Sequence, residues 1–124
     1  MKFVLAETPR YWWPVTVRMP HPEAAGQIIE QQLDILFEPQ GQDAALDTAE
    51  AAGAATSPRD FAEQEQATLR AICRDWRGVV DDATGDVPFS DTAFSAAIQM
   101  VWFRQAVFAA YRESLTGEAA RLGN

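Results

Sequence analysis

The first third of the chain alternates apolar and polar residues with a period of two, which is typical of β-strands with one buried face. The alternating apolar positions are Phe3 and Leu5, then Val15, Val17 and Met19, then Ile29, Leu33, Ile35 and Phe37. Proline and glycine residues between these stretches predict turns. The pattern therefore predicts a three-stranded antiparallel β-meander over residues 1–39, and its apolar face requires a covering layer of helices.

The next segment, residues 40–56, is rich in alanine, glycine and acidic residues. Leu46 is its one large apolar side chain. Such a segment buries too little apolar surface to offset the entropy lost on ordering it. We therefore expect a flexible linker, with an Ala-rich helix as the alternative.

Helical periodicity begins after the linker. Ser57 is a typical N-cap, Pro58 suits the first helical position and Asp60 suits the first turn. The apolar positions that follow at helical spacing are Phe61, Leu69, Ile72, Cys73 and Trp76. The spacing predicts one amphipathic helix that ends at Gly78.

A second helix is predicted from Ser90, and a third helix, or a bent continuation, from about Met100 to Gly117. Residues 57–117 are thus expected to form a layer of two or three helices, with residues 118–124 as a tail. The predicted fold class is α+β, in a single domain over residues 1–124, a length that can bury a real core.

The acidic stretch around Gly85 invites comparison with a calcium-binding loop, which needs oxygen ligands at positions 1, 3, 5 and 12 and a glycine at 6. Counting from Asp81 places Gly85 at 5 and Thr92 at 12, and counting from Asp82 places Ala93 at 12. Neither register fits. A turn between two helices, with Gly85 at positive φ and Ser90 capping the next helix, is the better interpretation.

Residues with catalytic potential are few. His21 is the one histidine, so neither a histidine metal cluster nor a Ser-His-Asp arrangement can be assembled around several of them. Ser57 and Ser90 are better explained as helix caps, and Cys73 as a small apolar residue of its helix. No glycine-rich phosphate loop is present. We therefore expect no enzyme activity, no cofactor and no metal.

The charge balance narrows the classes of partner. The net charge is −8, from 18 acidic and 10 basic residues, and Lys2 is the one lysine. Nucleic-acid binding relies on clustered basic residues, so it is excluded. No apolar run is long enough to span a membrane. With one cysteine and no signal-peptide pattern, the sequence predicts a cytoplasmic protein in a reducing compartment.

Two pairs of adjacent aromatic residues stand out, Trp12–Trp13 and Trp102–Phe103. Neighbours in a strand point to opposite faces, so Trp12 and Trp13 cannot both lie in the core. The outward residue either covers the sheet edge or anchors a partner, since Trp is enriched in binding hot spots. We expect the four residues to border a groove for an amphipathic helix, as partner-binding residues.

Several short motifs resemble the small tail assembly chaperones of long-tailed bacteriophages and prophages. They are Trp13-Pro14-Val15 in a strand pair, a helix ending in Asp75-Trp76-x-Gly78-Val79, then Asp82, Gly85 and Pro88-Phe89-Ser90, and finally Ala110-Tyr111-Arg112-Glu113 with Asn124. The resemblance covers most of the chain except residues 40–56. It implies a structural motif of Trp76, Gly78, Gly85, Phe89, Ser90 and Tyr111 that fixes the acidic turn against the last helix.

The resemblance also implies a function. Members of this family bind the tape measure protein, keep it soluble, help to recruit tail tube subunits and leave before the virion is mature. Some are also made as a longer frameshifted product. Two other functions stay open, a structural head-tail connector or tail completion protein of a phage or prophage, and a small cytoplasmic adaptor or regulatory domain.

Overall fold

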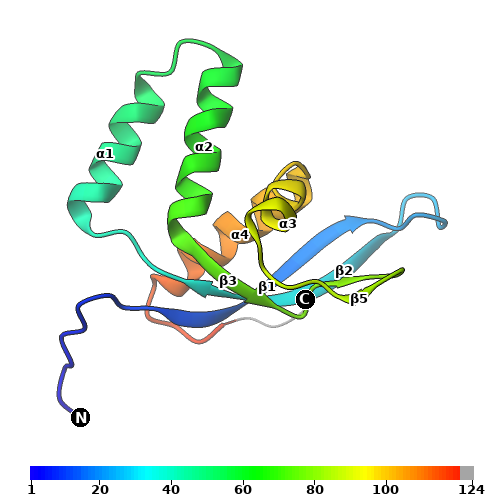
Figure 1. Ribbon diagram of the computed structural model, residues 1–124, viewed down its shortest axis with the longest axis horizontal. Coiled ribbons are helices and arrows are strands. Elements are labelled where there is room, and N and C mark those ends of the chain that lie inside the picture. Colours follow the sequence, from blue (N-terminus) through cyan, green and yellow to red (C-terminus); the bar gives the residue numbers. More distant parts are fainter. Residues whose placement is uncertain (121–124) are drawn as a thin grey trace. The chain divides into compact units, whose positions relative to one another are not determined.

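The computed structural model describes residues 1–120 (Figure 1); Asn124 and the rest of 121–124, the end of the expected tail, lie outside the described residues. The elements are β1 (Tyr11–Pro20), β2 (Ile28–Phe37), α1 (Gln42–Gly53), α2 (Pro58–Ile72), β3 (Cys73–Arg77), β4 (Val80–Asp81), β5 (Gly85–Asp86), α3 (Asp91–Ala97) and α4 (Val101–Ser114). The predicted fold class, α+β with a three-stranded antiparallel sheet and a helical layer, is confirmed.

The third strand of the sheet is not the one that the sequence pattern predicted. The strand order is β1-β2-β3, and residues 1–10 form no strand. The edge of β2 that faces away from β1 pairs with β3. Next to this pairing, the Glu38 N–H donates a hydrogen bond to the Ile72 carbonyl at 2.8 Å. The predicted meander over residues 1–39 is therefore wrong. Phe3 and Leu5 do occupy alternate positions, but β3, a later segment, is the third strand of the sheet.

The first amphipathic helix is correspondingly shorter than predicted. α2 ends at Ile72, and Cys73 has the extended backbone of a strand, with φ −104° and ψ 115°. The prediction of a helix up to Gly78 is therefore wrong for residues 73–77. Helical spacing placed Cys73 and Trp76 on one stripe, yet pairing with β2 gives the backbone another set of hydrogen bonds.

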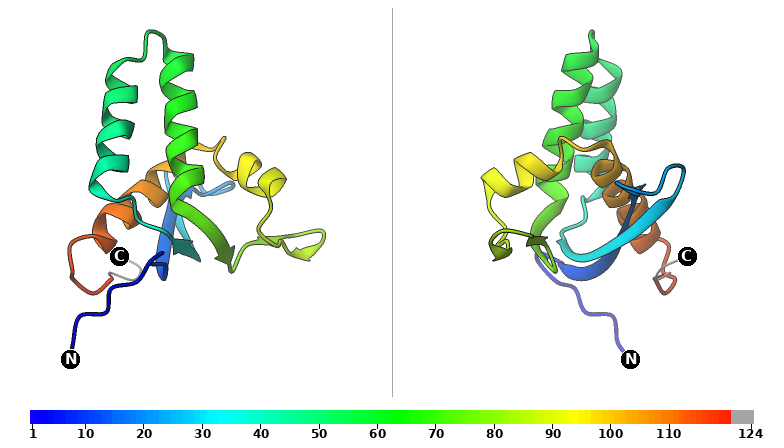
Figure 2. Two further views of the ribbon diagram at one scale, coloured as in Figure 1. Left: turned by 60° about the vertical axis from the view of Figure 1, so that its left-hand side comes forward. Right: turned by 90° about the vertical axis from the view of Figure 1, so that its right-hand side faces the viewer.

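Residues 40–56 contain a helix, the alternative to the flexible linker. α1 covers most of this segment, and α1 and α2 lie side by side in all views (Figures 1 and 2). None of its residues is buried. Alanine, glutamine and glutamate favour helix intrinsically, and contact with α2 adds the stabilisation that the isolated segment lacks. The linker interpretation overlooked this neighbour.

The helix caps follow the prediction. The Ser57 hydroxyl accepts a hydrogen bond from the Asp60 N–H at 3.0 Å, and the Ser90 hydroxyl accepts one from the Ala93 N–H at 3.0 Å. Each serine thereby satisfies one backbone donor of the first helical turn, which has no partner within the helix. The roles of Ser57 and Ser90 as caps are confirmed.

The acidic stretch is a turn, as predicted, but its neighbours differ. β4 and β5 pair antiparallel, with Val80 opposite Asp86 and Asp81 opposite Gly85. Gly85 has φ +81°, a conformation that side chains disfavour, so the predicted positive φ is confirmed. The turn closes a short β-hairpin between β3 and α3 and does not join two helices. The helical pattern had been extended too far along the chain.

The chain divides into two compact units, which are described separately. Unit 1 contains Met1–Tyr11 and Leu36–Arg74, and its buried side chains are Phe37, Leu69, Ile72 and Cys73. Unit 2 contains Trp12–Ile35 and the described residues from Asp75 onward. A single domain over residues 1–124 stays a prediction. No helix among residues 1–120 is both long and apolar enough to cross a lipid bilayer.

Unit 2 holds the residues predicted to bind a partner and those of the predicted structural motif. Its β1–β2 hairpin curls around α4 (Figure 2). The fully buried side chains there are Val15, Ile98 and Val107, together with Ile35 and Phe94 at 1% and 2% exposure. The inner face is apolar and carries the core. On the outer face, Thr16 and Gln32 are hydrogen-bonded across the two strands.

Candidate partner-binding pocket

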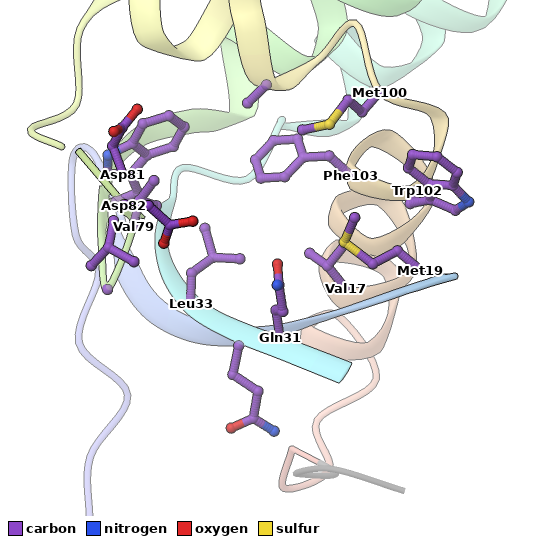
Figure 3. Close-up of a pocket in the computed structure, with 15 residues that line it drawn as sticks. Val17, Met19, Gln31, Leu33, Val79, Asp81, Asp82, Met100, Trp102 and Phe103 are labelled. Carbon is purple, nitrogen blue, oxygen red and sulfur yellow. The ribbon is translucent and has the colours of Figure 1, made fainter. Parts of the chain in front are cut away.

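Unit 2 contains an open pocket of about 600 Å³, shown in Figure 3. One side is formed by Val17 and Met19 of β1 and by Leu33 of β2, and the opposite side includes Trp102 and Phe103 of α4. Most of the lining side chains are apolar. A concave, mainly apolar surface with a few polar groups is the usual form of a binding site.

A cluster of aromatic rings supports the inner wall of the pocket, and Trp76 and Phe103 are the members that line it. Trp76 lies at 5.3 Å from Phe89, 6.1 Å from Phe94 and 6.2 Å from Phe103, measured between ring centroids. The Trp76 indole N–H donates to the Val87 carbonyl at 2.9 Å. Trp76 and Phe103 are 5% and 6% exposed. The wall is therefore held in place by ring packing and by one partly buried hydrogen bond.

The residues of the predicted structural motif have different roles in this wall. Trp76 and Phe89 pack edge to face. Their part in fixing the turn against the last helix stays a prediction. Gly78 has φ +84°, and a Cβ there would lie 3.6 Å from the Leu33 Cα. The backbone conformation, and not the available space, is what requires glycine at this position. Tyr111 is half-buried on α4, and its part in fixing the turn stays a prediction.

The rim of the pocket is formed where α3 and α4 are separated by a short break. The Arg104 guanidinium donates to the Ile98 and Gln99 carbonyls at 2.7 and 3.0 Å, so it satisfies acceptors that the end of α3 leaves unpaired. Met100 has an extended backbone there, with φ −87° and ψ 126°. The break leaves Met100 and Trp102 partly exposed, at 45% and 37%. The predicted bend near Met100 is thus a helix break.

The two ends of the pocket differ in chemistry. Asp81, Asp82 and Val79 lie at one end, and Met19, Met100 and Trp102 at the other (Figure 3). The Asp81 carboxylate accepts a hydrogen bond from the Ala83 N–H at 2.7 Å and so belongs to the turn. Asp82 is exposed. An apolar segment with a basic residue at one end would match both ends.

Trp12 and Trp13 lie outside this pocket. The Trp13 indole N–H donates to the Glu113 carboxylate on α4 at 3.2 Å. On the other face of the sheet, the Arg77 guanidinium lies 4.2 Å above the Trp12 ring and also contacts the Asp34 carboxylate at 3.0 Å. The two tryptophans do point to opposite faces. The expectation of one groove bordered by both aromatic pairs is wrong, because only Trp102 and Phe103 line it.

The pocket also includes residues that no sequence pattern marked as a site. Met19 had been placed on a strand face, Met100 at a bend, and Asp81 and Asp82 in a turn. The apolar run Met100-Val101-Trp102 was the one signal in the sequence that could have indicated this surface. Their meeting depends on contacts between the β1–β2 hairpin and α4, which are distant in sequence.

The remaining polar candidates have structural surroundings. The His21 Nδ1 accepts hydrogen bonds from two backbone N–H groups of its own loop, both at 3.0 Å. Burial raises the pKa of the Cys73 thiol to about 12, so the thiol stays protonated and unreactive at neutral pH. Within residues 1–120, no group of three or more His, Cys, Asp or Glu side chains is arranged to hold a metal ion.

Comparison of the chain with protein-family models, with curated proteins and with solved structures gave no match. The functional assignment therefore depends on the pocket and on the motifs of the sequence.

Proposed function

We propose that this protein is a phage tail assembly chaperone whose pocket holds an apolar helical segment of the tape measure protein. The observation that carries the proposal is the apolar pocket with a fixed aromatic wall and a partly exposed rim of Met100 and Trp102. The motifs around Trp76, Gly78 and Phe89 that resemble this family lie in or beside that wall. Resemblance and geometry thus point to the same surface.

The pocket suits the insertion of large apolar side chains from one face of a helix. Such helices bind by placing side chains at positions i, i+3, i+4 and i+7 into an apolar groove. Met19 and Met100 can adjust their side chains to several partner shapes, because methionine is unbranched and flexible. A chaperone for a long protein with many similar helices benefits from this adaptability.

Charge contributes in two ways. Asp81 and Asp82 at one end of the pocket favour a segment that carries a basic residue beside its apolar face. The net charge of −8 gives a complex with an apolar partner a repulsive, soluble surface. In this proposal the protein acts in the cytoplasm of the host bacterium, assists tail tube assembly and leaves before the virion is complete. It does so by binding alone, as a protein that is not an enzyme.

Co-expression with overlapping fragments of the tape measure protein tests the proposal. The wild-type protein is expected to keep at least one fragment soluble and to co-purify with it. Trp102→Ser should lose most of this ability, because it removes an aromatic side chain from the pocket rim. Phe103 is a poor choice for this test, since its burial makes it part of the core.

Leu46→Ser is the matched control. Leu46 is a large apolar side chain on α1 with 52% exposure, and it lies outside the pocket. A general loss of surface hydrophobicity would affect both variants, whereas pocket binding predicts a loss for Trp102→Ser alone. Thermal melts should show both variants folded. If Trp102→Ser retains fragments as well as the wild type does, the pocket is not the chaperone site.

A structural head-tail connector or tail completion protein is the second candidate. The exposed apolar residues Phe3, Val4 and Leu5 favour it, because a subunit that stays in the particle uses such residues to join its neighbours. Mass spectrometry of purified virions separates the two functions. A chaperone is absent from them, while a structural subunit is present in a fixed ratio to the other tail proteins.

A further inference from the structure

The segment before β1 leaves large apolar side chains in solvent. Phe3, Val4 and Leu5 are 88%, 79% and 87% exposed, and residues 1–10 belong to no helix or strand. Isolated exposed apolar residues are common, but a contiguous run usually marks a surface that another molecule covers. The alternation of apolar and polar residues here also suits an extended conformation.

The same segment carries a charge that complements the pocket. Lys2 is the one lysine of the chain, and it directly precedes Phe3. The pocket combines an apolar lining with Asp81 and Asp82 at one end. Asp82 is exposed and forms no hydrogen bond or ion pair within residues 1–120. The chain thus contains both an apolar segment beside a cation and an apolar pocket beside an unpaired anion.

We infer that residues 2–5 of a second copy of this chain dock into the pocket. In an extended segment Phe3 and Leu5 point to the same side, so both can enter between the β1–β2 hairpin and α4. The long side chain of Lys2 reaches back to Asp82 at the rim, since lysine keeps its charged end in water while its stem covers apolar surface. The pocket volume of about 600 Å³ accommodates two such side chains.

A second copy fits better than the chain's own segment because of reach. Five residues lie between Leu5 and Tyr11, and a fully straight chain over these six Cα–Cα steps spans about 20 Å. Tyr11 is in turn about 20 Å from Val17 along β1, at the rise of a strand. Leu5 would therefore reach Val17 only if the segment ran perfectly straight, yet it bends at residues 7–8 and contains Pro9. Phe3 and Leu5 are also exposed, so they do not fill the pocket of their own copy. A second copy brings its own segment without this constraint.

Self-association of this kind is expected to be weak and competitive. Two copies that each carry a net charge of −8 repel one another, which limits their affinity. The inference rests on the proposed function in that both use one pocket. The inference adds that residues 2–5 of a second copy cover the pocket until a partner with more apolar contact displaces them. Self-association and partner binding therefore exclude each other.

Sedimentation velocity of the full chain, from low micromolar to near-millimolar concentration, tests the inference. The average mass of the wild type should rise with concentration. A Phe3→Ser, Leu5→Ser double variant should associate at least about tenfold more weakly, because two apolar side chains lose their burial. Leu46→Ser, equally a loss of an exposed apolar side chain, should associate like the wild type. Thermal melts should show no change, since neither segment residue is packed.

A charge exchange tests which surface receives the segment. Lys2→Glu and Asp82→Lys should each weaken association severalfold, and the two changes together should restore it. A wild type that stays monomeric throughout, a double serine variant that associates like the wild type, or a charge exchange that restores nothing would each overturn the inference.

The fragment assay distinguishes this inference from the proposed function. The Phe3→Ser, Leu5→Ser variant should hold tape measure fragments at least as well as the wild type, because its pocket is intact and free of competition. If no fragment is held by any form while association still depends on Phe3, Leu5 and Asp82, the proposed function fails and the inference stands. If fragments are held but the wild type stays monomeric, the inference fails and the proposed function stands.

Discussion

The two aromatic pairs, Trp12–Trp13 and Trp102–Phe103, look alike in sequence and differ in the structure. On strand β1 the tryptophans point to opposite faces, and each is engaged by a charged side chain, Arg77 over Trp12 and Glu113 at Trp13. At the start of α4 one ring is buried and the other borders an open pocket. Adjacent aromatics therefore indicate a binding surface only where the fold leaves one of them beside an unfilled volume.

The largest predicted effect on stability is at Phe103, in the pair Trp102–Phe103. Phe103→Ala should lower the free energy of unfolding by about 3 to 5 kcal/mol, because it empties part of the buried ring cluster. Trp76→Ala, in the same cluster, should cost a similar amount. Trp102→Ala should cost less than about 1 kcal/mol, as its ring is partly in solvent. Urea unfolding measures all three.

Equal losses at Phe103 and Trp102 would contradict the distinction between a core residue and a rim residue. A loss under about 1 kcal/mol for Trp76→Ala would mean that the aromatic wall is not packed as described.

A smaller effect is expected at Trp13. Trp13→Phe keeps most of the apolar ring but removes the hydrogen bond to Glu113, so it should cost about 1 kcal/mol. Glu113→Gln keeps an acceptor at the same place and should cost less. In a double-mutant cycle the Trp13→Phe change should cost less once Glu113 is replaced by Ala. If the free-energy losses of Trp13→Phe and Glu113→Ala are strictly additive in the double variant, α4 and the inner face of β1 are not coupled through this pair.

The smallest effect concerns Trp12. Arg77→Gln removes the cation above the ring and the contact with Asp34, both at an exposed site, so the expected loss is about 0.5 to 1 kcal/mol. Arg74→Gln, an equal change of charge at an exposed position of the same strand, is the control and should stay within about 0.3 kcal/mol of the wild type. If both variants lose the same amount, net charge and not the stacked pair is responsible.

Local sequence features predicted local structure well. Ser57 and Ser90 were identified as caps from the residues next to them, and Gly85 was identified as a positive-φ position from its turn. Each depends on interactions within three or four residues. The sequence also predicted either a new helix or a bend near Met100, and the structure has a helix break there. Such interactions are present in the chain whatever the rest of the fold does.

Pairing between distant segments was not predictable in the same way. A short apolar pattern of two or three positions is compatible with both a strand and a helix. This ambiguity applies to Phe3 and Leu5 and to Cys73 and Trp76. Only the edge of β2 decided between them, and it pairs with residues around Ile72. The side chains of Phe3 and Leu5, which lie in no strand, are therefore exposed.

The sequence by itself thus determined the α+β class, the acidic surface, the helix starts and the presence of two aromatic pairs. The tertiary structure decided which strand completes the sheet and which aromatic pair meets the pocket. It also brought Asp81 and Asp82 to the same cavity as Met19, Met100 and Trp102. The physical reason is that composition and short-range hydrogen bonds act along the chain, whereas strand pairing and cavity formation depend on segments far apart in sequence competing for the same surfaces.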